Sequence, residues 1–276
     1  MSPWIALALG TVEGLTEYLP VSSTGHLILA GHWLGLPDDD PATSAFEIVV
    51  QLGAILAVAA QYRQLLAQRG RGLLKGDAAA VRLLVALAIA FVPTAAAGLL
   101  LRKAIKGHLF GPLPVAYALA VGGIAMIAVE RGLRARRPSG SGSAPGGDDG
   151  LEKVTPPRAL AIGLGQCLSL WPGTSRAMCT IVAGQLAGLS TATAAEFSFL
   201  LALPTLGAAT LYEAAKARHA LASHIGGTNL AIGLAVSFLV AWGVIATFLK
   251  YLRTRGLEPF GWYRVVVGLL VLWTFR

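Results

Sequence analysis

Long apolar stretches alternate along the chain with short polar segments. A helix that crosses a membrane needs about 20 mostly apolar residues, and several of these stretches reach that length without interruption. We therefore expect an all-α, polytopic integral membrane protein. The expected spanning helices lie at about 45–61, 83–101, 113–130, 192–214, 228–249 and 260–275.

Two further apolar stretches, at about 3–36 and 158–189, are interrupted by polar residues. The first contains the segment Pro20–His26, and the second contains Pro172–Arg176. Irregular backbone at membrane depth is stable only where protein surrounds it or where it lines a wet cavity. We therefore expect each stretch to form a re-entrant helix hairpin, which enters the membrane and returns to the same side.

A hydrophilic tract at 131–157 separates the chain into two halves. Its Gly, Ser and Pro residues are typical of a flexible linker. We expect a first membrane repeat at 1–130 and a second at 158–276, and in each of them a broken hairpin precedes the spans.

The two halves share a weak internal repeat. Leu19–Ser23 aligns with Trp171–Ser175, and Thr43–Glu47 aligns with Ala192–Glu196 at the start of the next span. Interrupted helices at matching places are typical of the inverted-topology repeats of transporters. The pattern predicts an inverted repeat, with hairpins that enter from opposite faces.

Composition agrees with a membrane location, because 55% of the residues are hydrophobic and 13% are charged. A soluble domain carries about 25% charged residues, so an ordinary soluble enzyme or a nucleic-acid binder is excluded despite the net charge of +8. Lys and Arg concentrate in 62–82, 131–158 and 250–255. Because cytoplasmic loops are rich in basic residues, we expect these segments in the cytoplasm and the first hairpin on the outer face.

The first hairpin carries a dense set of ionisable and hydroxyl side chains. Glu13 and Glu17 share one helix face, and Mg²⁺, which prefers one or two carboxylates together with phosphate oxygens, would relieve their repulsion. The alternative is one protonated carboxyl that hydrogen-bonds to the other. Ser23 and His26 have the spacing of a nucleophile beside a base, or of a helix cap beside a core histidine.

The second hairpin predicts an anion site. After the Pro172–Gly173 break, Thr174 and Ser175 precede an apolar helix, whose free N–H groups attract phosphate. Arg176 can bind phosphate oxygens with two hydrogen bonds. The alternative is a kinked helix from which Arg176 reaches the membrane interface.

Other polar groups in the apolar spans have less distinctive surroundings. Glu47 and Glu196 are candidates for proton sites or for contacts with the metal-binding and phosphate-binding side chains, and helix capping is an equal alternative. Gln51 and Arg264 receive no role from the pattern, and the two cysteines are expected to serve packing. A carboxylate pair, a hydroxyl beside a base and an arginine at an anion site together indicate phosphoryl chemistry at a membrane.

The segment Glu13–His26, with the sequence EGLTEYLPVSSTGH, resembles the first signature of the undecaprenyl-diphosphate phosphatases, also called bacitracin-resistance proteins. Phe46–Ile55, Trp171–Arg176 and Ala195–Pro204 resemble further segments of this family, so the similarity covers nearly the whole chain. The sequence departs from the family directly after Arg176, where Ala177–Cys179 replaces the Ser, Gly and small residue that are usual in the family.

The resemblance implies a multi-pass enzyme of the bacterial plasma (inner) membrane that removes one phosphate from undecaprenyl diphosphate. This reaction recycles the lipid carrier of peptidoglycan synthesis and confers bacitracin resistance. The resemblance also implies a divalent cation as cofactor, Mg²⁺ or alternatively Ca²⁺, and an active site facing the periplasm or exterior. The expected partners are the polyprenyl diphosphate lipid and the bilayer, and no nucleic acid is expected to bind. The oligomeric state stays open between a monomer and a homodimer.

Residue by residue, Glu13 and Glu17 match the acidic motif of the family, Ser23 and His26 match its proposed nucleophile and its general base or acid, and Arg176 matches its phosphate-binding arginine. We expect Glu17 to take part in catalysis with Ser23 and His26, and Glu13 and Glu17 to bind the metal. Further phosphate contacts are expected from Ser22, Thr24, Thr174 and Ser175.

The main alternative function is a polyprenyl-phosphate flippase or another secondary transporter, which a repeat with broken helices would suit. A transporter needs no nucleophile. The acidic pair together with Ser23 and His26 therefore favours the enzyme.

Overall fold

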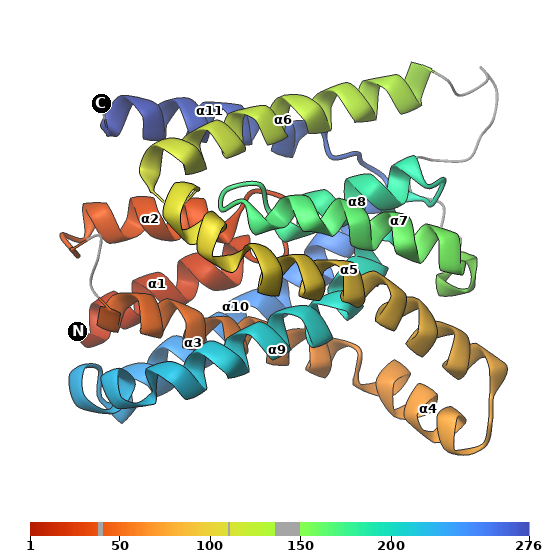
Figure 1. Ribbon diagram of the computed structural model, residues 1–276, viewed down its shortest axis with the longest axis horizontal. Helices are drawn as coiled ribbons and strands as arrows, with labels where there is room; N and C mark the ends of the chain where they lie inside the picture. The colour runs from red at the N-terminus through yellow and green to blue at the C-terminus, as the bar shows by residue number, and fades with distance from the viewer. Residues whose placement is uncertain (38–40, 110, 136–149, 276) are drawn as a thin grey trace.

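The computed structural model is helical, without strands, over the residues that it describes, which are 1–37, 41–109, 111–135 and 150–275 (Figure 1). The middle of the predicted linker, 136–149, lies outside these residues. In chain order the elements are α1 (Pro3–Thr16), α2 (Ser23–Trp33), α3 (Pro41–Gln61), α4 (Arg63–Leu74), α5 (Ala78–His108), α6 (Pro112–Ala135), η1 (Leu151–Lys153), α7 (Pro156–Gln166), η2 (Cys167–Leu170), α8 (Arg176–Leu186), α9 (Thr191–His224), α10 (Gly227–Leu252) and α11 (Glu258–Thr274). The expected all-α fold class is confirmed.

Among the described residues, five helices are long and apolar enough to cross a membrane, namely α3, α5, α6, α9 and α10. The range expected at 260–275 is occupied by α11, which has 17 residues. At about 1.5 Å per residue, α11 is shorter than the ~30 Å thickness of a hydrocarbon core. The segment after α3 is a helix, α4, where the sequence predicts a loop.

Each interrupted apolar stretch forms a pair of short helices. α1 and α2 are separated by residues 17–22, and α7 and α8 are separated by η2 and residues 171–175. In Figure 1 the α1–α2 pair has its free ends at the left, whereas the α7–α8 pair has its free ends at the right. The two connecting loops therefore approach the interior from opposite ends of the bundle.

The two loops end in the same backbone geometry. Ser22 and Ser175 each have a φ of 73°, a left-handed conformation that is uncommon outside glycine, and each caps the helix that follows it. The structure therefore pairs Ser22 with Ser175, whereas the sequence alignment pairs Ser23 with Ser175. The difference arises because the second loop is one residue longer between its proline and its cap, where Gly173 adopts a φ of 97°.

Glycines bring each hairpin close to a long helix of the other half. On α1, a Cβ atom at Gly10 would lie 2.7 Å from the carbonyl oxygen of Gly233 on α10. On α7, a Cβ atom at Gly163 would lie 2.5 Å from the carbonyl oxygen of Ala90 on α5. Any larger residue would push these helices apart. Each hairpin is therefore held by the opposite half of the chain.

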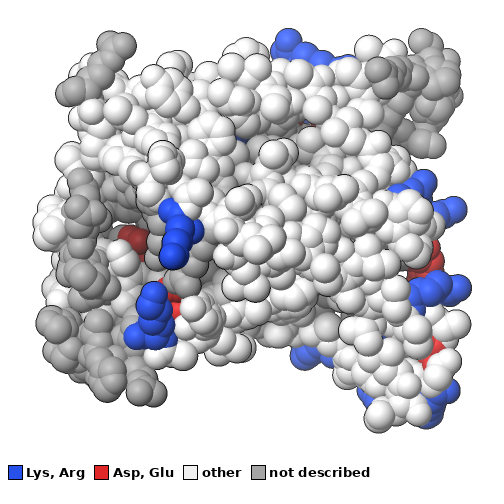
Figure 2. Space-filling model, viewed as in Figure 1, with Lys and Arg blue, Asp and Glu red and all other residues white. Residues whose placement is uncertain are grey.

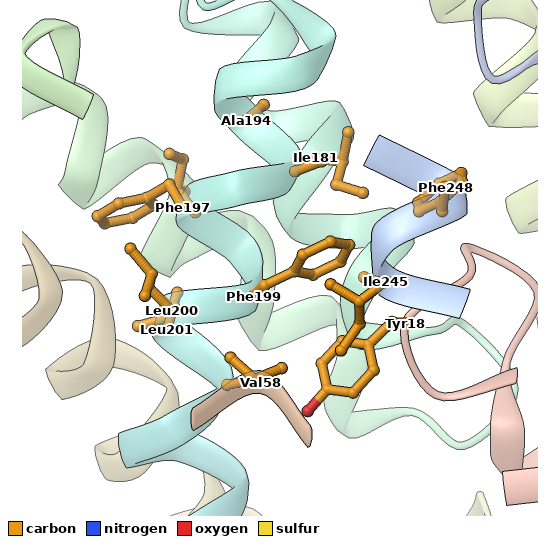
Figure 3. Packing of buried hydrophobic residues seen from close by; sticks show 14 of the residues in the cluster. Tyr18, Val58, Ile181, Ala194, Phe197, Phe199, Leu200, Leu201, Ile245 and Phe248 are labelled. Carbon is orange, nitrogen blue, oxygen red and sulfur yellow. The ribbon is translucent and has the colours of Figure 1, made fainter. Parts of the chain in front are cut away.

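The main hydrophobic core surrounds the first part of α9, where Phe197, Phe199, Leu200 and Leu201 are fully buried (Figure 3). Tyr18, in the loop after α1, packs edge-on against Phe199, with ring centroids 5.2 Å apart. This edge-to-face geometry is favourable for an aromatic pair. The contact fixes the end of the first hairpin against α9.

The sides of the bundle carry few charges. In the view of Figure 2, Lys, Arg, Asp and Glu gather mainly at the right-hand end, and a broad uncharged surface covers the middle. Large apolar side chains such as Val92, Ile124 and Leu239 are more than half exposed, at 59%, 59% and 61%. An apolar surface of this extent is unusual for a protein in water and indicates contact with lipid. The chain is a multi-pass membrane protein.

Candidate active site

The two loops bring a carboxylate and a guanidinium together in the interior. Glu17 directly follows α1, and Arg176 is the first residue of α8. Arg176 Nη2 donates a hydrogen bond of 3.1 Å to Glu17 Oε1, and both side chains are buried. A buried charge that loses its partner is strongly destabilising. The ion pair therefore couples the position of one hairpin to that of the other.

Ser23 is the third side chain of this cluster. Its hydroxyl donates a hydrogen bond of 2.7 Å to Glu17 Oε2, the oxygen that does not bind Arg176. Ser23 is the first residue of α2, just as Arg176 is the first residue of α8. A half-buried hydroxyl held by a carboxylate is well placed to lose its proton and act as a nucleophile.

Helix α9 holds Arg176 from the opposite side. Arg176 Nη1 donates to the main-chain oxygen of Ser198 at 3.1 Å and to its hydroxyl oxygen at 3.0 Å. Thr180, on α8, shares a hydrogen bond of 2.6 Å with the same hydroxyl. The central guanidinium carbon lies 5.3 Å from the centroid of the Tyr18 ring, a cation–π arrangement. Sequence reasoning missed these partners, although a hydroxyl inside an apolar span, such as Ser198, is a signal that could have found one.

Gln51 connects Glu17 to a more distant part of α9. Its amide nitrogen lies 3.5 Å from Glu17 Oε2, and its amide oxygen accepts a hydrogen bond of 2.9 Å from the hydroxyl of Thr210. The first contact is long and therefore weak. The amide supports the carboxylate without competing strongly with Ser23 for the same oxygen.

His26 faces away from Ser23. Its Nδ1 lies 2.8 Å from the main-chain oxygen of Ser22, and its Nε2 lies 2.8 Å from the hydroxyl of Tyr263 on α11. The hydroxyl of Ser23 binds Glu17, not the imidazole with which the sequence pairs it. The reason is local, because the imidazole turns back to the carbonyl group of its own helix cap, four residues earlier.

Three of the expected phosphate-binding hydroxyls hold the loops in shape. Ser22 and Ser175 are buried, and their hydroxyl oxygens accept from backbone N–H groups three residues further on, at 3.4 and 3.3 Å. Thr174 donates to main-chain oxygens in η2 and in the turn that follows. Thr24 is exposed at the start of α2.

Glu13 is a second buried carboxyl of the site, with 1% of its surface exposed. It lies one helical turn before Glu17, whose backbone N–H donates to the main-chain oxygen of Glu13 at 3.0 Å, and its Oε1 has no hydrogen-bond partner among the described residues. Two adjacent carboxyls with an unpartnered oxygen fit Mg²⁺, which takes one or two carboxylates and fills its remaining positions with phosphate oxygens and water. Within the described part of the chain, no group of three or more His, Cys, Asp and Glu side chains could hold a metal.

The remaining candidate carboxyls come from α3 and α9. Glu47 on α3 is half-buried and interacts electrostatically with Glu13. Glu196 on α9 is two residues before Ser198, the partner of the arginine. Both cysteines are free thiols.

Comparison with known proteins then places the chain in a family. The family described as bacitracin resistance protein BacA matches residues 6–270. The chain belongs to this family. An undecaprenyl-diphosphatase from Sorangium cellulosum is 58% identical over 97% of this chain and 85% of its own length. Undecaprenyl-diphosphatase 1 from Burkholderia thailandensis and an undecaprenyl-diphosphatase from Novosphingobium aromaticivorans are 45% and 43% identical, over 97% of this chain and 93% and 96% of their own lengths.

The departure from the usual bacitracin-resistance pattern after Arg176 is absorbed by packing. Ala177, Met178 and Cys179 are buried in α8. A Cβ atom at Gly122 on α6 would lie 3.0 Å from the terminal carbon of Met178. The absence of a side chain at this glycine leaves room for the methionine.

A second buried arginine in this family member joins both loops. Arg264 on α11 is fully buried, and its Nη1 donates to the main-chain oxygen of Pro20 at 3.2 Å. Its Nη2 donates to the main-chain oxygens of Gly173 at 3.0 Å and Ala118 at 3.1 Å. Sequence reasoning assigned this residue no role, although an arginine in an apolar span is itself a signal of function. Arg264 ties the first loop, the second loop and α6 together.

Proposed function

We propose that this protein is an undecaprenyl-diphosphate phosphatase of the bacterial plasma membrane. It removes the terminal phosphate from undecaprenyl diphosphate and returns undecaprenyl phosphate to peptidoglycan synthesis, and this activity confers bacitracin resistance. The observation that carries the proposal is the cluster of Ser23, Glu17 and Arg176, in which a hydroxyl, a carboxylate and a guanidinium meet between two loops. The names of nearly full-length relatives support the same substrate.

In the proposed reaction, Ser23 Oγ attacks the terminal phosphorus while Glu17 Oε2 accepts the hydroxyl proton over the 2.7 Å hydrogen bond. The bond from phosphorus to the bridging oxygen breaks, and undecaprenyl phosphate leaves. Arg176 Nε has no hydrogen-bond partner among the described residues, so it can donate to a phosphoryl oxygen as charge develops there. Water then hydrolyses phospho-Ser23, and the proton on Glu17 returns to the hydroxyl.

Glu13 and Glu17 would hold a divalent cation, Mg²⁺ or alternatively Ca²⁺. When bound, such a cation supplies positive charge to the diphosphate oxygens. The unpartnered oxygen of buried Glu13 supports this assignment.

We further propose that the fold is an inverted repeat in which the α1–α2 and α7–α8 pairs are re-entrant hairpins. Their loops approach from opposite ends in Figure 1, and the matched φ of Ser22 and Ser175 supports a common origin of the two loops. The excess of Lys and Arg in 62–82 and 131–158 favours a cytoplasmic position for the end that carries α4. The first hairpin then opens to the periplasm or exterior.

Phosphate release from a C55 diphosphate by the purified protein in detergent, with and without Mg²⁺, tests the proposal. We expect release that depends on the cation and is lost in Ser23→Ala. A folded wild-type protein that releases no phosphate would refute it. Transfer of polyprenyl phosphate across liposomes without hydrolysis would support the transporter alternative, which neither the hydroxyl–carboxylate contact nor the relatives' names favour.

A further inference from the structure

We propose that Tyr263 is a positioning residue that holds the orientation of His26 and donates a hydrogen bond to its Nε2 atom. The inference rests on the proposed phosphatase function, for which the family resemblance makes His26 a catalytic residue. The hydroxyl of Tyr263 on α11 and the Nε2 atom of His26 on α2 are 2.8 Å apart. The two rings are parallel within 3°, with centroids 5.6 Å apart. The hydrogen bond therefore holds the Nε2 atom in place, and the parallel ring restrains the plane of the imidazole.

The tautomer follows from the other ring nitrogen. His26 Nδ1 lies 2.8 Å from the main-chain oxygen of Ser22, and a carbonyl oxygen only accepts hydrogen bonds, so Nδ1 carries a hydrogen. In the neutral imidazole, Nε2 then has the lone pair and accepts from the hydroxyl of Tyr263. Ser22 and Tyr263 together keep the basic nitrogen at Nε2.

The basic nitrogen points toward the protein surface and not toward Ser23. Tyr263 is 46% exposed, whereas the hydroxyl of Ser23 donates to buried Glu17. Glu17 is therefore the group that takes the proton of Ser23, and His26 is held as a separate base beside a half-exposed tyrosine. Tyr263 is the side chain that holds it there.

The neighbouring residue on α11 supports a positioning role for this helix. Arg264 binds the main-chain oxygen of Pro20, at one side of the first loop. Tyr263 binds His26, in the first turn of the helix that follows the loop. Two consecutive residues of α11 thus restrain the segment that contains Ser22 and Ser23 from both sides.

Tyr263→Phe tests the inference, because it removes the hydroxyl and keeps the ring. The matched control is Tyr117→Phe, which removes a hydroxyl from a tyrosine that is 55% exposed on α6, the helix that packs along α11. We expect Tyr263→Phe to lower kcat about tenfold with little change in KM. Both variants should keep the Tm of the wild type, because both tyrosines are about half exposed.

Imidazole ¹⁵N NMR of histidine-labelled protein provides a readout that needs no turnover. The signals of His26 are assigned by their loss in His26→Gln. We expect a protonated Nδ1 and a bare Nε2 in the wild type and in Tyr117→Phe, and a displaced Nε2 signal in Tyr263→Phe. An unchanged Nε2 signal or an unchanged kcat in Tyr263→Phe would each overturn the inference. If the wild type releases no phosphate, the proposed function fails, whereas the nitrogen spectrum still decides the tautomer.

Discussion

Arg176→Lys keeps a positive charge between the two loops and removes the planar fork of the guanidinium. In the native protein, Nη2 binds Glu17 while Nη1 binds both the main-chain oxygen and the hydroxyl of Ser198. A lysine ammonium is a single nitrogen, so it cannot reach α9 and the end of α1 with the same geometry. We expect it to stay with Glu17 and to lose the contacts with Ser198.

The loss can be estimated from the contacts. A hydrogen bond to a charged group contributes about 1.5–3 kcal/mol, so the two bonds to Ser198 amount to about 3 kcal/mol at the lower value. This loss lowers the free energy of unfolding and also frees the side chain to shift. Because a misplacement of about 1 Å can cost about 100-fold in rate, kcat/KM for phosphate release should fall about 100-fold. Arg176→Met should be worse for folding, by about 3–5 kcal/mol, because it leaves the carboxylate of Glu17 buried and unpaired.

Phosphate release and thermal unfolding are measured in the same detergent. Arg134→Lys is the control, because it makes the same change at an arginine whose side chain is 54% exposed at the end of α6. A kcat/KM of Arg176→Lys equal to that of this control would show that Arg176 supplies only a general positive field, and the argument from the planar fork would be refuted.

Three further outcomes test other parts of the proposal. Ser23→Ala should lose at least about 10³-fold in kcat at unchanged Tm, and substantial residual turnover would exclude a serine nucleophile. Chelation of divalent cations should abolish activity. Glu13→Gln should raise the Mg²⁺ concentration needed for half-maximal rate, and a Mg²⁺ dependence identical to that of the wild type would show that Glu13 does not bind the metal. In a background without the native cysteines, Pro37→Cys should react with an impermeant thiol reagent on intact cells and Lys75→Cys only after lysis, whereas the reverse would invert the topology.

Hydropathy locates most of the helices because a bilayer constrains both the length and the composition of a segment that crosses it. Five of the expected ranges lie within α3, α5, α6, α9 and α10, and the range 260–275 overruns α11 by one residue. The pattern misses α4, because a 12-residue helix rich in Arg and Gln is too short and too polar to resemble a span. Its stability depends on neighbours that hydropathy does not describe.

The loops of the candidate site are visible in the sequence, but their contacts are not. A polar side chain at a break in an apolar segment is costly to bury, so one that is present there is expected to have a function. This argument selects Glu17, Ser23 and Arg176 without any knowledge of the fold. Which of them touch depends on how the two halves meet. Arg176 reaches Glu17 across 159 residues, and Tyr263 reaches His26 across 237. Local spacing encodes neither pair, which is why it suggests the nearer partner, Ser23, for His26.

The two loops share a backbone geometry but present different chemistry, and this difference is what makes a reaction possible. Ser22 and Ser175 adopt the same left-handed conformation, so the residue after each cap begins a helix, and both of these residues reach Glu17. Two serines at these positions would leave the buried carboxylate without a cation, and two arginines would leave the site without a nucleophile. One loop therefore supplies the attacking hydroxyl through Ser23, and the other supplies through Arg176 the charge that a phosphoryl group requires.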